Sequence, residues 1–188
     1  VAALIGTRDA LRAVDPARLP ITWTELPAAL DIETAQGAHA AQLHAGRDRN
    51  VMCGGRVTCG DPGAALARAN VTVEGRFQSG FVEHGYIEPE AGFAEIVNGR
   101  VEVHACTQAP MMDREGLERV LGMPAAQIRI VPTAVGGGFG AKLDMSVQPY
   151  LALAALKTGK PVRICYTRTE SMQCSTKRHP SDITLKIG

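Results

Sequence analysis

The stretch AEIVNGRVEVHACT, residues 94–107, decides the fold class. Apolar and polar side chains alternate on both sides of Asn98-Gly99, which is typical of two half-buried β-strands. Asn and Gly tolerate the positive φ angles that a type I′ turn requires at both of its central positions. The sequence therefore predicts a two-residue β-hairpin at this point.

Helical and strand-like segments surround the hairpin. Asp61 before Pro62 favours a helix start, because Asp caps free N–H groups and Pro is tolerated in the first turn. Gly122 and Gly159 follow apolar helical stretches and predict their ends. The predicted helices cover residues 7–14 (capped by Thr7), 64–69, 112–121 and 150–158, and the predicted strands cover residues 1–5, 21–26, 71–82, 127–132, 162–166 and 183–188. This mixture predicts an α+β or mixed α/β domain, with residues 31–57 as a long irregular connection.

Composition excludes several classes of protein. The chain has 188 residues, of which 45% are hydrophobic and 21% charged, which is typical of a globular protein. Twenty Lys and Arg against 19 Asp and Glu give no electrostatic reason to expect nucleic acid as a partner. No apolar run approaches the ~20 residues that span a bilayer, so we expect no membrane association through a helix.

The cysteines and histidines form no metal-binding motif. The five cysteines include no C-x-x-C pair, and the histidines include no H-x-x-x-H pair. We therefore expect reduced thiols, a cytoplasmic location and no metal ion bound directly by side chains of this chain.

A glycine-rich segment, AVGGGFGAK at residues 134–142, is the strongest candidate for a ligand-binding loop. Glycine permits positive φ and lets another molecule approach the backbone closely. Lys142 is followed by Leu143 rather than Ser or Thr, so the segment is not a Walker phosphate loop, and it lacks the Rossmann G-x-G-x-x-G spacing. The spacing alone leaves a second interpretation open, a tight turn in which Phe139 fills a gap in the core.

Several segments, in order and at fitting intervals, resemble the molybdenum-cofactor subunit of the xanthine dehydrogenase and aldehyde oxidase family. The resemblance is strong over residues 60–188. It is carried by HGYIEPEAGFAE (84–95), ACTQAP (105–110), VLGMPAAQIRIVPTAVGGGFGAK (120–142), ALAALKTGKPVRICYTRTESM (152–172) and KRHP (177–180).

The resemblance implies two domain regions and a molybdenum–pterin (molybdopterin) cofactor. Residues 1–57 resemble the end of a preceding small α/β domain with a long connecting segment, and residues 58–188 resemble the amino-terminal part of the cofactor-binding domain. In the family, a glutamine lies beside the metal and a G-G-F-G loop passes close to the cofactor. The matching cofactor-binding positions here are Gln108, Gly137, Gly138, Phe139 and Gly140.

The implied reaction is hydroxylation of a carbon centre with oxygen derived from water, with electrons passed to iron–sulfur clusters and in some relatives FAD on partner subunits or domains. The family's catalytic base is a glutamate far downstream, so we expect it beyond Gly188 and expect this chain alone to be inactive. Glu88 and Glu90 match a segment that is structural in the family, and we expect no catalytic role for them.

The substrate pocket departs from the xanthine-oxidising pattern at one position. In those enzymes a glutamate that recognises the purine follows the loop lysine, whereas this chain has Leu143. An apolar side chain leaves a polar purine edge unpaired, which favours aldehydes or less polar aromatic N-heterocycles as substrates. Phe139 and Leu143 are the expected pocket residues.

Other residues receive simpler interpretations. Cys106 is expected as a small buried hydrophobe at a strand end, and His104 as a solvent-facing residue of the hairpin. Met111 and Met112 are expected in the core or a pocket wall, and Arg178 and His179 as anchors for loop packing. The alternative to an enzyme fragment is a non-catalytic remnant or subunit-binding module with the same fold. A nucleotide-binding protein is disfavoured because neither phosphate-loop fingerprint is present.

Overall fold

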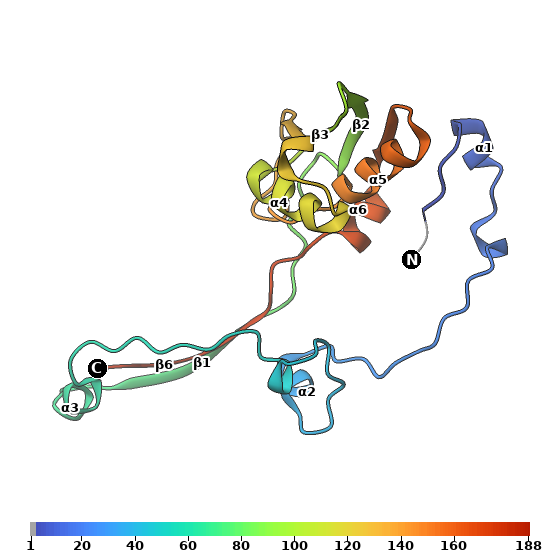
Figure 1. The fold of residues 1–188 in the computed structure, drawn as a ribbon. Helices are drawn as coiled ribbons and strands as arrows, with labels where there is room; N and C mark the ends of the chain where they lie inside the picture. Colours follow the sequence, from blue (N-terminus) through green and yellow to red (C-terminus); the bar gives the residue numbers. More distant parts are fainter. Residues whose placement is uncertain (1–2) are drawn as a thin grey trace. The chain divides into compact units, whose positions relative to one another are not determined.

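The structure is a computed structural model that describes residues 3–188 (Figure 1). In chain order the helices are α1 (Arg8–Arg12), α2 (Ile32–Gln36), α3 (Pro62–Ala67), α4 (Pro110–Leu121), α5 (Gln148–Thr158) and α6 (Arg168–Cys174). The strands are β1 (Val73–Ser79), β2 (Ala91–Val97), β3 (Arg100–Ala105), β4 (Ile128–Pro132), β5 (Val162–Cys165) and β6 (Ser181–Ile187). Short 3-10 turns cover Pro16–Arg18, Asp48–Asn50 and Ala125–Gln127.

The hairpin is the centre of a four-stranded mixed sheet with the order β4-β3-β2-β5. Strand β2 pairs antiparallel with both β3 and β5, whereas β3 pairs parallel with β4. Asn98 and Gly99 form the turn with φ angles of 49° and 78°, as a type I′ turn requires. The predicted hairpin and the predicted α+β class are confirmed.

Helices α4 and α5 cover one face of this sheet and form the core with it. Val101, Val103 and Ala105 alternate along β3 and point to this face, where Leu117 of α4 and Leu151 of α5 meet them. All five side chains are buried. The alternation of apolar and polar residues along the sequence therefore reflects a sheet of which one face is covered by helices.

The helix ends follow the predicted signals. Asp61 caps α3 by accepting a hydrogen bond from the backbone N–H of Ala64 at 2.9 Å. Gly122 and Gly159 end α4 and α5 in the left-handed conformation. Helix α6, which was not predicted, has a complete capping box between Thr167 and Glu170. The T-x-x-E spacing was the signal that could have revealed this helix.

Two predicted strands near the start of the chain are wrong. Residues 3–5 and 21–26 form no strand, and the side chains of Leu4, Ile5, Trp23 and Leu26 are exposed. The first two residues of the predicted strand 1–5 lie outside the described residues. Helix α1 is capped by Thr7 as predicted but ends at Arg12, and the irregular connection 31–57 contains α2. Strands need a neighbouring strand to pair with, and among residues 3–188 no strand pairs with either segment.

The chain divides into two compact units. One contains Gly75–Leu185, with the four-stranded sheet and helices α4, α5 and α6, and the other contains Thr7–Glu74 with Lys186–Gly188. Strands β1 and β6 form a separate two-stranded sheet. The division follows packing and does not test the family-based boundary between residues 57 and 58, which stays a prediction.

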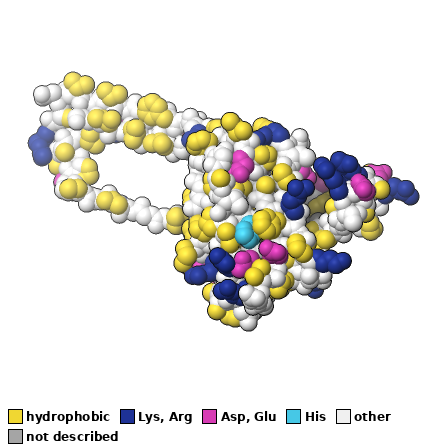
Figure 2. Space-filling model, turned by 90° about the horizontal axis from the view of Figure 1, so that it is seen from above, with side chains coloured by type: hydrophobic (Ala, Val, Ile, Leu, Met, Phe, Trp, Pro, Cys, Tyr) yellow, Lys and Arg dark blue, Asp and Glu magenta, His cyan; other side chains and the backbone are white. Residues whose placement is uncertain are grey.

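Figure 2 shows charged side chains of both signs on one face of the molecule. Basic and acidic side chains are interspersed there among exposed hydrophobic ones. Among the described residues, none of the helices has the length and apolar character needed to cross a bilayer.

Candidate cofactor-binding site

The glycine loop follows β4 and has an unusual backbone. Gly137, Phe139 and Gly140 have φ angles of 106°, 54° and 96°, all in the region that L-residues rarely adopt. Glycine adopts these angles at little cost, but Phe139 is strained by about 1–3 kcal/mol. The loop therefore has a defined conformation, which the surrounding contacts must maintain.

Gln108 closes the loop from the end of β3. Its side-chain Oε1 accepts hydrogen bonds from the backbone N–H groups of Gly140 at 3.1 Å and Lys142 at 3.3 Å. Because Oε1 is the acceptor for both groups, the amide nitrogen Nε2 is the atom that remains available as a donor. The structure thus brings together Gln108 and the glycine loop, the two parts of the chain that the family resemblance marked as cofactor-binding.

The loop offers several unused donors. Among the described residues, no protein group accepts a hydrogen bond from the N–H groups of Gly137, Gly138 or Phe139, or from Nε2 of Gln108. A cluster of free N–H groups on a glycine backbone suits a ligand that carries oxygen atoms or negative charge.

Gly138 lies so close to the Gln108 side chain that a residue with a side chain of its own would not fit there unless Gln108 moved. A Cβ atom there would lie 2.7 Å from Cδ of Gln108, closer than non-bonded atoms approach. Phe139 is 74% exposed, so the interpretation in which it fills a gap in the core is wrong. Leu143 is also exposed, which leaves both predicted pocket residues available for a ligand.

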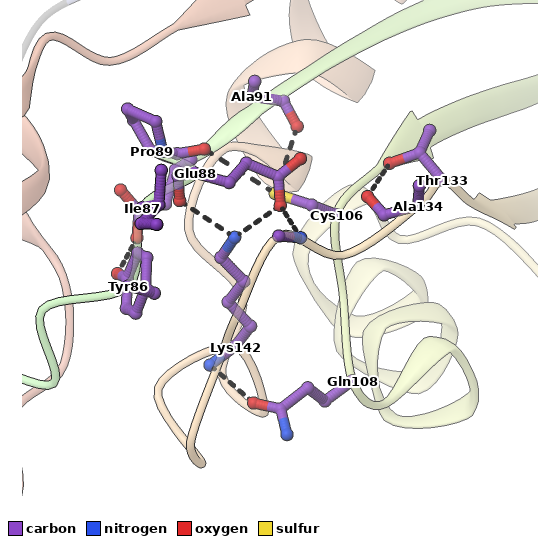
Figure 3. A network of polar contacts seen from close by, with 12 residues as sticks. Tyr86, Ile87, Glu88, Pro89, Ala91, Cys106, Gln108, Thr133, Ala134 and Lys142 are labelled. Atoms are coloured by element: carbon purple, nitrogen blue, oxygen red, sulfur yellow. Dashed lines mark hydrogen bonds and ion pairs between the residues drawn. The ribbon is translucent and has the colours of Figure 1, made fainter.

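An ion pair between the buried Lys142 and the partly exposed Glu88 lies beside the loop (Figure 3). Nζ of Lys142 lies 2.8 Å from Oε2 of Glu88 and donates a second hydrogen bond to the Glu88 carbonyl oxygen at 3.1 Å. It also lies 4.7 Å from the ring centroid of Tyr86. The Lys142 side chain is only 2% exposed, so its charge depends on these partners.

The two carboxylates of the E-P-E segment have structural partners, which supports their structural interpretation. Burial raises the pKa of Glu88, but hydrogen bonds from Lys142 and Gly136 outweigh it, and the pKa lies below its ordinary value. Glu90 accepts a hydrogen bond from the hydroxyl of Tyr86. Burial and this bond raise the pKa of Tyr86.

Three further sequence predictions can be compared with the structure. Cys106 is buried as predicted, and its thiol faces the carbonyl oxygen of Ala91 at 3.6 Å (Figure 3). His104 is not solvent-facing: its ring stacks on Phe93 with 4.2 Å between centroids, because the two residues are directly opposite each other in β2 and β3. Arg178 pairs with Val82 through backbone hydrogen bonds and so anchors a loop as predicted.

The two methionines of α4 differ from the prediction in part. Neither Met111 nor Met112 belongs to the core, because both are exposed at the start of the helix. Met111 lines a hollow of about 360 Å³ together with the arginine side chains Arg100, Arg114 and Arg129. This hollow shares no residue with the glycine loop.

Among the described residues, no group of three or more His, Cys, Asp or Glu side chains could hold a metal ion. An organic group that carries oxygen atoms would instead bind to the loop through hydrogen bonds. The free N–H groups of the loop and the Gln108 amide fit such a group, because they are hydrogen-bond donors for oxygen-rich ligands.

Comparison with known proteins assigns the family. The family model described as the molybdopterin cofactor-binding domain matches residues 43–188. The chain therefore belongs to the molybdopterin cofactor-binding domain family.

Named relatives agree with this assignment. The chain is 34% identical over 171 residues to the nicotinate dehydrogenase large molybdopterin subunit of Eubacterium barkeri, covering 90% of this chain and 40% of that protein. It is 30% identical over 189 residues to the xanthine dehydrogenase molybdenum-binding subunit of Escherichia coli, covering 99% of this chain and 25% of that protein. These relatives are molybdenum-dependent oxidoreductases.

The fold is also similar to a solved structure. The aldehyde oxidoreductase from Desulfovibrio gigas aligns with a TM-score of 0.77 and 30% identity, over 86% of this chain and 18% of that chain. The chain thus spans less than half the length of each of these relatives.

The sequence did not reveal which side chains hold the glycine loop in place. The family resemblance indicated a structural role for Glu88, but nothing in the sequence paired Glu88 with Lys142 or indicated a role for Tyr86. All three residues lie within the segments that carried the family resemblance, but no spacing rule connects positions 54 residues apart.

Proposed function

We propose that this chain supplies the cofactor-contacting loop of a molybdenum hydroxylase, and that it is one part of a longer catalytic subunit. The observation that carries the proposal is the set of free donors on Gly137, Gly138, Phe139 and the Gln108 amide, held in one place by the loop. The family assignment and the names of the relatives agree with it.

In this proposal, the Gln108 amide and the free backbone N–H groups of residues 137–139 hold and orient the molybdenum–pterin group, and Gly140 supports them through its hydrogen bond to Gln108. When bound, that group supplies two-electron oxidation of a carbon centre with an oxygen atom derived from water. Gln108 donates from Nε2, because its Oε1 is already engaged by two loop N–H groups. Phe139 provides an apolar wall between the cofactor and the substrate.

The substrate proposed is an aldehyde or an aromatic N-heterocycle of low polarity. Leu143 is exposed beside the loop and cannot make a hydrogen bond to a purine edge. An aldehyde that gains one oxygen from water becomes a carboxylic acid and releases two protons and two electrons. Partner subunits or domains with iron–sulfur clusters and in some cases FAD would accept those electrons.

The general base is proposed to come from elsewhere in the subunit. Glu88 binds Lys142 and Glu90 binds Tyr86, so both carboxylates have structural partners. The whole assembly is proposed to work in the cytoplasm, which agrees with five cysteines that are all free of disulfides.

The test is an analysis of the natural full-length protein purified with its partners. We expect about one molybdenum and one pterin per subunit by elemental analysis and mass spectrometry. In water labelled with oxygen-18, benzaldehyde should yield labelled benzoate faster than xanthine yields labelled urate. Absence of molybdenum, or unlabelled product, would contradict the proposal and favour a non-catalytic module.

A further inference from the structure

We infer that Glu88 is a positioning residue which, with Lys142, clamps both ends of the glycine loop and so keeps its free donors in place for the cofactor. This inference rests on the proposed function for the identity of the ligand. The clamp itself rests on contacts within the chain.

One oxygen atom of Glu88 connects the two ends of the loop. Oε2 accepts a hydrogen bond from the backbone N–H of Gly136 at 2.8 Å, and the same atom lies 2.8 Å from Nζ of Lys142. The backbone N–H of Glu88 also donates to the carbonyl oxygen of Gly136 at 3.3 Å. Residues 137–141 lie between these two anchors, so a single carboxylate fixes where the loop begins and ends.

Lys142 acts within the clamp rather than on a ligand. An ammonium group has three N–H donors, and two of them are used by the carboxylate and carbonyl oxygens of Glu88. The ring face of Tyr86 occupies another side of the ammonium group. With its side chain 2% exposed, Lys142 has no free surface to offer an anion, unlike the lysine of a Walker loop.

The loop fits closely against the segment that contains Glu88. A Cβ atom at Gly136 would lie 2.7 Å from Cβ of Glu88, and one at Gly137 would lie 2.9 Å from Cβ of Tyr86. Two of the glycines are therefore needed for contact with the clamp. The clamp leaves the N–H groups of Gly137, Gly138 and Phe139 free, while the protein uses the N–H groups of Gly136, Gly140 and Lys142.

A simpler role for Glu88 is to neutralise a buried lysine. The two roles differ in a double variant, because removing both charges leaves no unpaired charge at the buried position of Lys142 and costs little stability. We therefore compare Glu88→Gln, Lys142→Met and the double variant in the natural full-length protein without cofactor. Glu102→Gln is the control, because Glu102 is another carboxylate in an ion pair, which it forms with Arg129 at 3.1 Å.

Hydrogen exchange, measured by mass spectrometry on the peptide 134–143, is the readout. We expect both single variants to lower the melting temperature and to speed exchange of this peptide. We expect the double variant to recover most of the melting temperature, while its loop peptide still exchanges about tenfold faster than in the wild type. The control should leave exchange of this peptide unchanged.

A double variant whose loop peptide exchanges at the wild-type rate would overturn the inference, because Glu88 would then serve only to neutralise Lys142. This outcome is separate from a failure of the proposed function. If the wild-type protein contains no molybdenum, the proposed ligand is wrong, but exchange of the cofactor-free loop still decides whether the clamp exists.

Discussion

Gln108 and Lys142 hold each other through reciprocal hydrogen bonds. The backbone N–H of Gln108 donates to the carbonyl oxygen of Lys142 at 2.9 Å, and the backbone N–H of Lys142 donates to Oε1 of the Gln108 side chain at 3.3 Å. The first contact joins the end of the β3 segment to the end of the glycine loop. The second fixes the orientation of the Gln108 amide, so that its nitrogen is left for a ligand.

The orientation of this amide gives the first prediction. In Gln108→Glu, one carboxylate oxygen can still accept from Gly140 and Lys142, but the other replaces the free donor with a negative charge. We expect the molybdenum content of the full-length protein to fall by about tenfold or more, while the free energy of unfolding changes by less than about 1 kcal/mol. Elemental analysis and urea denaturation measure the two effects. Full molybdenum content would show that Nε2 does not face the cofactor.

Gly138 gives the second prediction. In Gly138→Ala the new methyl group would collide with the Gln108 side chain, which is exposed and can move aside. The collision costs the hydrogen bonds to Oε1, so we expect a loss of stability of about 1–2 kcal/mol and a loss of cofactor.

A second glycine is the control for this variant. At Gly80 a Cβ atom would meet nothing within 4 Å, and its φ angle is not positive. Gly80→Ala should change stability by less than about 0.5 kcal/mol and leave the molybdenum content unchanged. Equal effects of the two substitutions would argue against a specific role for Gly138.

Phe139 gives the third prediction. Its ring is exposed and its φ angle is 54°, so the side chain contributes little to packing and its backbone is strained. In Phe139→Gly, relief of the strain and the greater flexibility of glycine in the unfolded chain oppose each other, and we expect a net stability change of less than about 1 kcal/mol.

The same substitution should remove an apolar wall of the substrate pocket. We expect kcat/KM for an aromatic aldehyde to fall by about 10-fold to 100-fold, whereas Phe139→Leu, which keeps an apolar side chain, should lose less. Steady-state kinetics on matched molybdenum contents measure this effect. An unchanged kcat/KM in Phe139→Gly would place the substrate elsewhere.

The sequence predicted most elements of the Gly75–Leu185 unit because their signals are local. Asn98-Gly99 specifies its turn by backbone preference, and Gly122 and Gly159 specify helix ends in the same way. The predicted strands at residues 3–5 and 21–26 failed because an apolar run does not show whether a partner strand exists. The stacking of His104 on Phe93 depends on strand register, which residue type alone does not give.

Part of the candidate site could also be predicted, because some of its signals are local in the sequence. The glycine loop is recognisable from its composition, and family resemblance pointed to Gln108. The contact between Glu88 and Lys142 joins positions 54 residues apart, and single charged residues at that separation form no pattern in a sequence. Tertiary structure was needed to show that these two residues hold the loop.

The ion pair gives the last prediction, which concerns pH. Burial raises the pKa of Glu88, but hydrogen bonds from Lys142 and Gly136 bring it below its ordinary value of 4.5 in the folded chain. A carboxyl whose pKa is lower in the folded than in the unfolded state stabilises the fold above pH 4.5. That contribution is lost as the pH falls through the lower, folded-state pKa.

Glu88→Gln lacks this titration. We therefore expect the difference in free energy of unfolding between wild type and Glu88→Gln to be largest above pH 4.5, and to shrink as the pH falls below it. Urea denaturation of both proteins between pH 7 and pH 3, a range chosen to bracket ordinary carboxyl pKa values, measures the difference. Asp182 and Glu83 also have lowered pKa values, but they titrate in both proteins and cancel on subtraction. A difference that stays constant across this range would show that the Glu88 carboxylate gains no stability from Lys142.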